Sequence, residues 1–200
     1  TFTLRGSNPV QVTSENREEL ARRPANRYTL RYLENCELKE ADYNGGASTP
    51  EQLRDLEGFL GRVGGDGGWV LAGGIIRVPG SRHTVIYSHA NSVDMGHTAG
   101  AGGEMANRLG VSVMVWDYPG YGLSSGRRGV DGEAEFYQSA EAMLAFSRTE
   151  LGVEAASLVF FGFSLGSAAA AHMALREPLA AALVLAGAFV SVLNVVRPRP

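Results

Sequence analysis

Ser164 lies in the run Gly162-Phe163-Ser164-Leu165-Gly166. The residues before it, 157–161, are largely apolar and rich in strand formers, whereas residues 167–175 after it are rich in alanine and typical of a helix. The pattern predicts a strand, a sharp turn with the serine at its tip, and a helix. Such a turn leaves no room for a Cβ on either side of the serine, which explains the two glycines. A hydroxyl held there is placed for nucleophilic attack, and the N–H groups that open the helix favour an anion formed beside it. The alternative is an ordinary strand-to-helix turn that happens to carry a serine.

A serine nucleophile needs a general base, and the chain after Ser164 offers one histidine, His172, and one acid, Glu177. His172 lies eight residues into the predicted helix, about 12 Å from its start at a rise of 1.5 Å per residue. It therefore cannot hydrogen-bond the serine that opens that helix. Either the sequence is a fragment, or the protein has lost the chemistry and kept the fold.

Strand and helix patterns alternate from residue 69 onward. Apolar runs predict strands at 69–78, 83–88, 111–116, 157–163 and 181–187. Amphipathic patterns predict helices at 97–109, from the cap at Asp131 to Gly152, and at 165–176. This alternation indicates an α/β domain with a mainly parallel sheet and helices on both faces, with Ser164 at the C-terminal end of a strand.

The first part of the chain is harder to interpret. We expect residues 1–68 to form an N-terminal extension and residues 69–200 the core domain. Within the extension, residues 27–33 favour a strand. A short helix is expected near 50–61, because Thr49 is a good N-cap, a proline follows it, and three leucines then share one helical face.

Composition excludes several classes of function. A net charge of -3 gives no electrostatic basis for nucleic-acid binding. The single Cys36 rules out an internal disulfide and leaves the compartment open, with an intracellular location as the expectation. No His, Cys and Asp cluster has metal-ligand spacing, and we expect neither a metal nor a cofactor. Residues 179–196 carry no charge and are long enough to span a bilayer, although residues 181–186 also fit a buried parallel strand.

Three segments carry a resemblance to a known family. They are Tyr87-Ser88-His89-Ala90-Asn91-Ser92-Val93-Asp94-Met95-Gly96, Trp116-Asp117-Tyr118-Pro119-Gly120-Tyr121-Gly122-Leu123-Ser124-Ser125-Gly126 and Gly162-Phe163-Ser164-Leu165-Gly166. In this order they resemble one branch of the α/β-hydrolase superfamily, the membrane-associated serine hydrolases that include protein depalmitoylases. The resemblance covers roughly residues 69–190. It implies a hydrolase of acyl esters or thioesters, with a sheet cut short after the strand that follows the nucleophile helix.

The resemblance also implies roles for individual residues. Ser164 would be the nucleophile, and the backbone N–H groups of Asn91 and Leu165 would form the oxyanion hole. The triad of such enzymes runs in the order Ser, acid, His, so the acid and the histidine would follow residue 200. The family usually has His-Gly where this chain has His89-Ala90, and a positive φ at Ala90 would cost about 1 kcal/mol.

The side chains around these positions have structural interpretations. We expect His89 to brace its loop rather than to act as the base, and Tyr118 and Tyr121 to pack in the core rather than to line a pocket. Asp117 is expected to accept hydrogen bonds from backbone N–H groups in the turn that follows it.

A second hypothesis comes from another class of protein. The chain would be a catalytically lapsed α/β-hydrolase that serves as a structural subunit of a larger assembly. Its partners would then be proteins instead of an acyl ester or thioester, and the open edge of its sheet would need a cover. Membrane association remains a third alternative.

Overall fold

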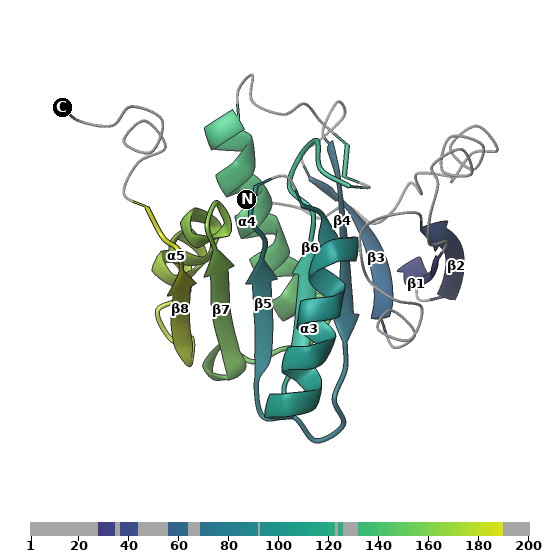
Figure 1. The fold of residues 1–200 in the computed structure, drawn as a ribbon, viewed down its shortest axis with the longest axis horizontal. Coiled ribbons are helices and arrows are strands. Elements are labelled where there is room, and N and C mark those ends of the chain that lie inside the picture. The colour runs from purple at the N-terminus through teal and green to yellow at the C-terminus, as the bar shows by residue number, and fades with distance from the viewer. Residues whose placement is uncertain are drawn as a thin grey trace.

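The computed structural model describes residues 28–34, 37–43, 56–63, 69–91, 93–122, 124–125 and 132–189. Figure 1 shows the arrangement of the elements. Their order is β1 (Tyr28–Glu34), β2 (Glu37–Tyr43), β3 (Leu56–Val63), β4 (Trp69–Ile76), β5 (Thr84–Ser88), α3 (Met95–Leu109), β6 (Ser112–Trp116), α4 (Gly132–Thr149), a 3-10 turn (Ala155–Ser157), β7 (Leu158–Phe163), α5 (Gly166–Arg176) and β8 (Ala182–Ala186).

One sheet joins the described strands, in the order β2-β1-β3-β4-β6-β5-β7-β8. The pairs β5–β6, β5–β7 and β7–β8 are parallel, as is β1–β3, while β1–β2, β3–β4 and β4–β6 are antiparallel. The predicted α/β class with a mostly parallel sheet is therefore confirmed. Parallel pairing also brings the C-terminal ends of β5 and β7 to the same edge of the sheet.

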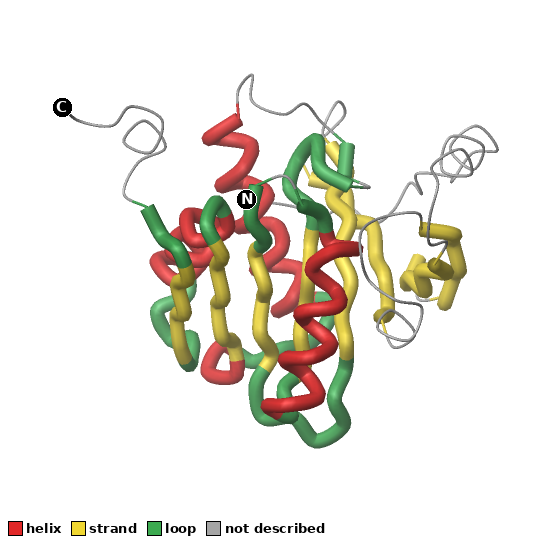
Figure 2. Tube along the Cα trace, in the orientation of Figure 1, coloured by secondary structure: helices red, strands yellow, loops and turns green. Residues whose placement is uncertain are grey.

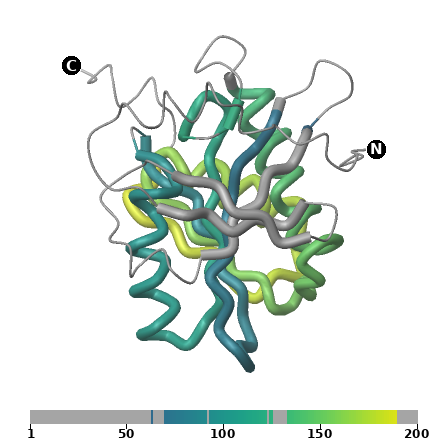
Figure 3. Tube along the Cα trace, turned by 90° about the vertical axis from the view of Figure 1, so that its right-hand side faces the viewer, coloured from purple at the N-terminus to yellow at the C-terminus, as the bar shows by residue number. Residues whose placement is uncertain are grey.

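Helices cover both faces of the sheet, as Figures 2 and 3 show. α3 lies on one face, where Ala99 and Ala106 pack with Val85, Val113 and Val115. α4 and α5 lie together on the other face. There Met143 and Met173 belong to a second buried cluster, which also holds the strand residues Ile86, Met114 and Phe160.

The elements predicted after residue 69 agree with the structure to within a few residues, and β1 confirms the strand predicted at 27–33. β4 and β5 follow each other around a turn at Gly80 without pairing. Instead β6 lies between them, antiparallel to β4 and parallel to β5. The helix cap predicted at Asp131 lies outside the described residues.

The helix predicted near 50–61 is wrong from Leu56 onward, because those residues form β3. β3 pairs with β4 in an unbroken antiparallel register, from Leu56 opposite Ile76 to Val63 opposite Trp69. Inter-strand hydrogen bonds along this whole length outweigh the helical spacing of the leucines, a case of tertiary context overriding local propensity. Residues 50–55 lie outside the described part of the chain. β1, β2 and β3, which lie in the expected N-terminal extension, belong to the same sheet as the strands after residue 69.

The uncharged segment 179–196 contains β8 rather than the start of a spanning helix. Its last residues, 190–196, lie outside the described part. In the described ranges no helix has both the length and the apolar character needed to cross a bilayer.

Candidate active site

Ser164 occupies the turn between β7 and α5, as predicted from the motif. Its φ is 52°, and among the described residues it is the one non-glycine with a positive φ. Its N–H donates to the carbonyl oxygen of Ala186 in β8 (2.8 Å), and its own carbonyl oxygen accepts from the N–H of Ser167 (2.9 Å). A left-handed backbone at a serine costs free energy, so the surrounding hydrogen bonds hold it in a conformation that it would not otherwise favour.

Two glycines let the chain approach itself closely on either side of Ser164. A Cβ built at Gly162 would lie 2.5 Å from the carbonyl oxygen of Gly166. One built at Gly166 would lie 2.7 Å from the carbonyl oxygen of His89, and closer still to the carbonyl oxygen of Ser88. The glycines are required because backbone atoms, which cannot move aside as a flexible side chain can, occupy the space of both Cβ atoms.

The second close approach places the loop after β5 directly against the serine turn. This loop contains His89, Ala90 and Asn91, and it leaves the same edge of the sheet as β7, since Ser88 pairs with Gly162. Asn91 is exposed, and Leu165 is half-buried. Ala90 has no positive φ, so the backbone strain considered for this position is absent.

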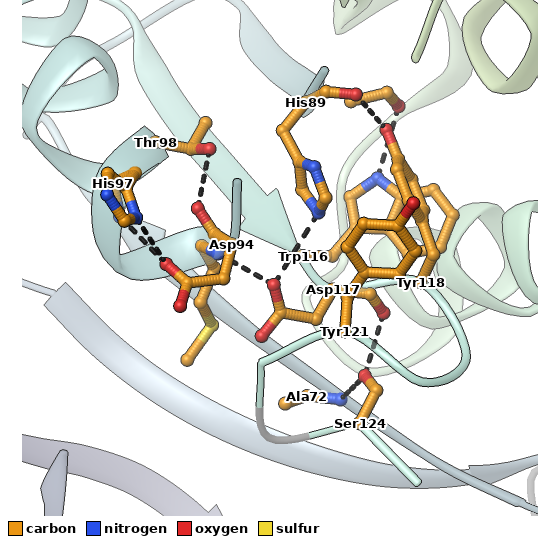
Figure 4. A network of polar contacts seen from close by, with 12 residues as sticks. Ala72, His89, Asp94, His97, Thr98, Trp116, Asp117, Tyr118, Tyr121 and Ser124 are labelled. Carbon is orange, nitrogen blue, oxygen red and sulfur yellow. Dashed lines mark hydrogen bonds and ion pairs between the residues drawn. The ribbon is translucent and has the colours of Figure 1, made fainter. Parts of the chain in front are cut away.

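The last residue of β6 and the loop after it hold the end of β5 and the β5 loop through three side chains, which Figure 4 labels: Trp116, Tyr118 and Tyr121. Trp116 Nε1 donates to Ser88 Oγ (3.1 Å), and Tyr118 Oη donates to the carbonyl oxygen of His89 (2.6 Å). Tyr121 Oη donates to Asn91 Oδ1 (2.6 Å). No local sequence pattern predicts these hydrogen bonds, because each joins residues that are 28 to 30 positions apart.

His89 is buried and braces the loop, as expected. Its Nδ1 lies 2.8 Å from the carbonyl oxygen of Ala90, and its ring lies 4.1 Å from that of Tyr118 between centroids. A carbonyl oxygen only accepts, so Nδ1 carries a proton. Nε2 lies 3.5 Å from Asp117 Oδ1, a contact that attracts only when a proton lies between the two atoms (Figure 4).

Asp117 is fully buried and ties the β6 loop to two other elements. Its Oδ1 accepts from the N–H of Met95, the first residue of α3 (2.6 Å). Its backbone oxygen accepts from Ser124 Oγ (2.7 Å), which in turn accepts from the N–H of Ala72 in β4 (2.8 Å). Burial raises the pKa of Asp117 above its usual value, and the hydrogen bond and charge of His89 oppose that rise in part.

The histidine and the acid that follow Ser164, His172 and Glu177, contact side chains of α4. His172 Nε2 lies 2.8 Å from Glu141 Oε1 in α4, and Glu177 accepts from Arg148 Nη1 (2.7 Å). These pairs link α5 and the residue after it to α4, which confirms that His172 is not positioned by its helix to serve Ser164.

The remaining histidines also lie apart from a base position. His97 contacts Asp94, the N-cap of α3, with Nδ1 3.1 Å from Oδ1. His83 precedes β5 and is exposed at the end of that strand opposite to His89. No group of three or more His, Cys, Asp or Glu in the described ranges could hold a metal ion.

Comparison with known proteins agrees with this arrangement. Residues 80–199 match the family model described as serine aminopeptidase, S33. The alpha/beta hydrolase domain-containing protein 17C of Xenopus tropicalis is 34% identical over 106 residues, which are 53% of this chain and 33% of that protein. The alpha/beta hydrolase domain-containing protein aho-3 of Caenorhabditis elegans is 32% identical over 121 residues, 60% of this chain and 35% of that protein. The chain thus spans about a third of the length of these relatives.

Solved structures share the fold. An alpha-beta serine hydrolase homologue from Coxiella burnetii superposes with a TM-score of 0.52 at 22% identity, over 64% of this chain and 61% of that one. An alpha-beta hydrolase from Vibrio vulnificus gives a TM-score of 0.50 at 20% identity, over 63% of this chain and 44% of that one. With the family model covering more than half of its residues, the chain belongs to the serine aminopeptidase, S33, family of the α/β-hydrolase superfamily.

Proposed function

We propose that this chain carries the nucleophile and the oxyanion hole of a serine hydrolase that cleaves acyl esters or thioesters. The observation that carries the proposal is the backbone of Ser164, a serine with a φ of 52° at the tip of a strand-to-helix turn. A strained serine in this position fits the nucleophile of an α/β-hydrolase.

In the proposed reaction Ser164 Oγ attacks the substrate carbonyl carbon and passes its proton to a base. The carbonyl oxygen becomes an oxyanion, which accepts hydrogen bonds from the backbone N–H groups of Asn91 and Leu165. Collapse of this tetrahedral intermediate expels the alcohol or thiol, which takes up a proton, and leaves an acyl-serine. Water then attacks the acyl-serine, releases the acid and restores the serine.

The reaction needs a histidine from outside the 200 residues. Three of the four histidines are engaged with other groups: His89 with Ala90 and Asp117, His97 with Asp94, and His172 with Glu141. His83 lies at the far end of β5. The proposal therefore concerns a longer protein, in agreement with the length of the relatives.

The proposed substrate class rests on the likeness to the branch that includes protein depalmitoylases, while the matched family model is named for an aminopeptidase. The test is to assay the longer natural protein on p-nitrophenyl esters, acyl thioesters and aminoacyl p-nitroanilides. Turnover of the esters and thioesters that Ser164→Ala abolishes supports the proposal. Turnover of the anilides alone would show that the protein is a peptidase and not a hydrolase of esters or thioesters.

A structural subunit is the second candidate, and β8 is the observation that favours it. Among the described strands, β8 forms one edge of the sheet, and Leu183, Val184 and Leu185 are each 43% exposed there. An apolar edge strand needs a cover, which a partner protein could provide. This candidate would be favoured if the longer protein showed no Ser164-dependent turnover of any of these substrates.

A further inference from the structure

The β5 loop is held at several points, and one of these lies at a residue of the proposed oxyanion hole. Tyr121 Oη donates to Asn91 Oδ1 over 2.6 Å. Tyr121 is 9% exposed, whereas Asn91 is exposed. A buried hydroxyl thus fixes the side chain of an otherwise solvent-facing residue whose backbone N–H is the proposed donor.

We propose that Tyr121 is a positioning residue for the oxyanion hole, acting through the side chain of Asn91. This inference rests on the proposed function. A hydrogen bond to the side chain restricts rotation about the bonds that join it to the backbone, and so limits how far the Asn91 N–H can turn away from the substrate oxygen. Oxyanion donors act only from a narrow range of positions, so such a restraint bears directly on rate.

The surroundings of Tyr121 make it a rigid support. Its ring lies 5.4 Å from that of Tyr118 and 5.5 Å from that of His89, between centroids. Its N–H donates to the carbonyl oxygen of Tyr118 (2.9 Å), and its carbonyl oxygen accepts from the N–H of Ser124 (2.8 Å). Ser124 is bound to β4 through Ala72, so the backbone of Tyr121 is anchored to the sheet.

The other contacts to the β5 loop act at different points and do not duplicate this one. Trp116 binds the side chain of Ser88, and Tyr118 binds the backbone oxygen of His89. Among the described residues, the hydroxyl of Tyr121 is the group that holds the side chain of Asn91. Its removal should loosen the loop at Asn91 while the earlier residues keep their bonds.

The test compares Tyr121→Phe with the wild-type longer protein and uses two readouts. The first is hydrogen–deuterium exchange of the peptide that spans residues 86–94. The second is kcat and KM on the best ester or thioester substrate. Tyr137→Phe is the matched control, because it removes the hydroxyl of a half-buried tyrosine that stacks on His172 instead of contacting the loop.

Tyr121→Phe should exchange faster in residues 86–94 and lower kcat about tenfold, less than the 10²–10³-fold loss of a whole oxyanion donor, with KM changed less than about twofold. Asn91→Ala, which keeps the backbone N–H, should have the same effect, and the double variant should be no worse than either single one. Tyr137→Phe should change neither readout.

Unchanged exchange in Tyr121→Phe, or faster exchange with unchanged kcat, would overturn the inference. Additive losses in the double variant would do the same, because the two residues would then act separately. A wild-type protein without Ser164-dependent turnover would contradict the proposed function instead, and the exchange comparison would still decide whether Tyr121 holds the loop.

Discussion

Gly166 lies against His89 so closely that a Cβ on the glycine would stand 2.7 Å from the carbonyl oxygen of the histidine. This approach joins the serine turn to the β5 loop through backbone atoms alone. The position of one segment therefore depends on that of the other, and a side chain at Gly166 must push them apart.

Gly166→Ala should lower the free energy of unfolding by about 3 kcal/mol, the upper end of the usual cost of overpacking, since the obstructing atoms are backbone. Gly152→Ala is the control. Gly152 has a positive φ, 66°, which Gly166 does not, but nothing lies within 4 Å of a Cβ there, so Gly152→Ala should cost only about 1 kcal/mol of backbone strain. Urea unfolding measures both, and equal losses would contradict the close approach.

Asp117 should make stability fall as the pH rises. Burial raises its pKa in the folded protein, so the folded state binds this proton more tightly than the unfolded chain, whose carboxyl titrates near 3.9. The free energy of unfolding of the wild type should exceed that of Asp117→Asn by the largest amount below about pH 4. This difference should decline as the pH rises through the folded pKa, by at most about 1.4 kcal/mol per pH unit. Urea unfolding between pH 4 and 8 tests this, and an advantage that grows with pH would show that the charge of His89 outweighs burial.

Glu141 should have the opposite pH dependence. Burial alone would raise its pKa, but the hydrogen bonds from His172 and Arg176 (2.8 and 2.7 Å) outweigh it, and the pKa is lowered. Glu141 therefore contributes to the free energy of unfolding above the pKa of a glutamate in the unfolded chain, near 4.3. This contribution is lost as the pH falls through the folded pKa. Glu141→Gln should lower the free energy of unfolding by less than about 1 kcal/mol at pH 7, because Arg176 is exposed, and the difference should vanish as the pH falls below the folded pKa. A cost that persists unchanged at low pH would assign the role of Glu141 to packing.

The 200-residue chain on its own should hydrolyse esters no faster than its Ser164→Ala variant. Without a base the serine hydroxyl stays protonated, and an oxyanion hole alone leaves only modest catalysis. An ester assay of the two proteins at equal concentration measures this. Turnover that Ser164→Ala removes would identify a base within this chain, and His89 would be the first residue to replace.

The sequence predicts the centre of the fold well, because β5, β6 and β7 are short apolar runs and α5 follows a diagnostic turn. It predicts β3 wrongly, because Leu56 and Leu60 have helical spacing while the pairing with β4 that decides the outcome involves residues far along the chain. The conformation of Ser164 follows from a local motif and is predictable for that reason.

The support of the β5 loop could not be predicted in the same way. Tyr118 and Tyr121 look like core residues in the sequence, and both are buried. Their hydroxyls nevertheless bind His89 and Asn91, and only the fold brings these residues together across some thirty positions. Burial can be inferred from residue type, whereas the partner of a buried hydroxyl depends on the topology of the sheet.

The central claim is that Ser164 is the nucleophile of a working hydrolase, and labelling by a fluorophosphonate probe tests it most directly. The longer natural protein should react rapidly at Ser164, and Ser164→Ala should abolish the label, while the 200-residue chain should react slowly or not at all. Absence of the label from the folded longer protein, or a label that persists in Ser164→Ala, would contradict the claim.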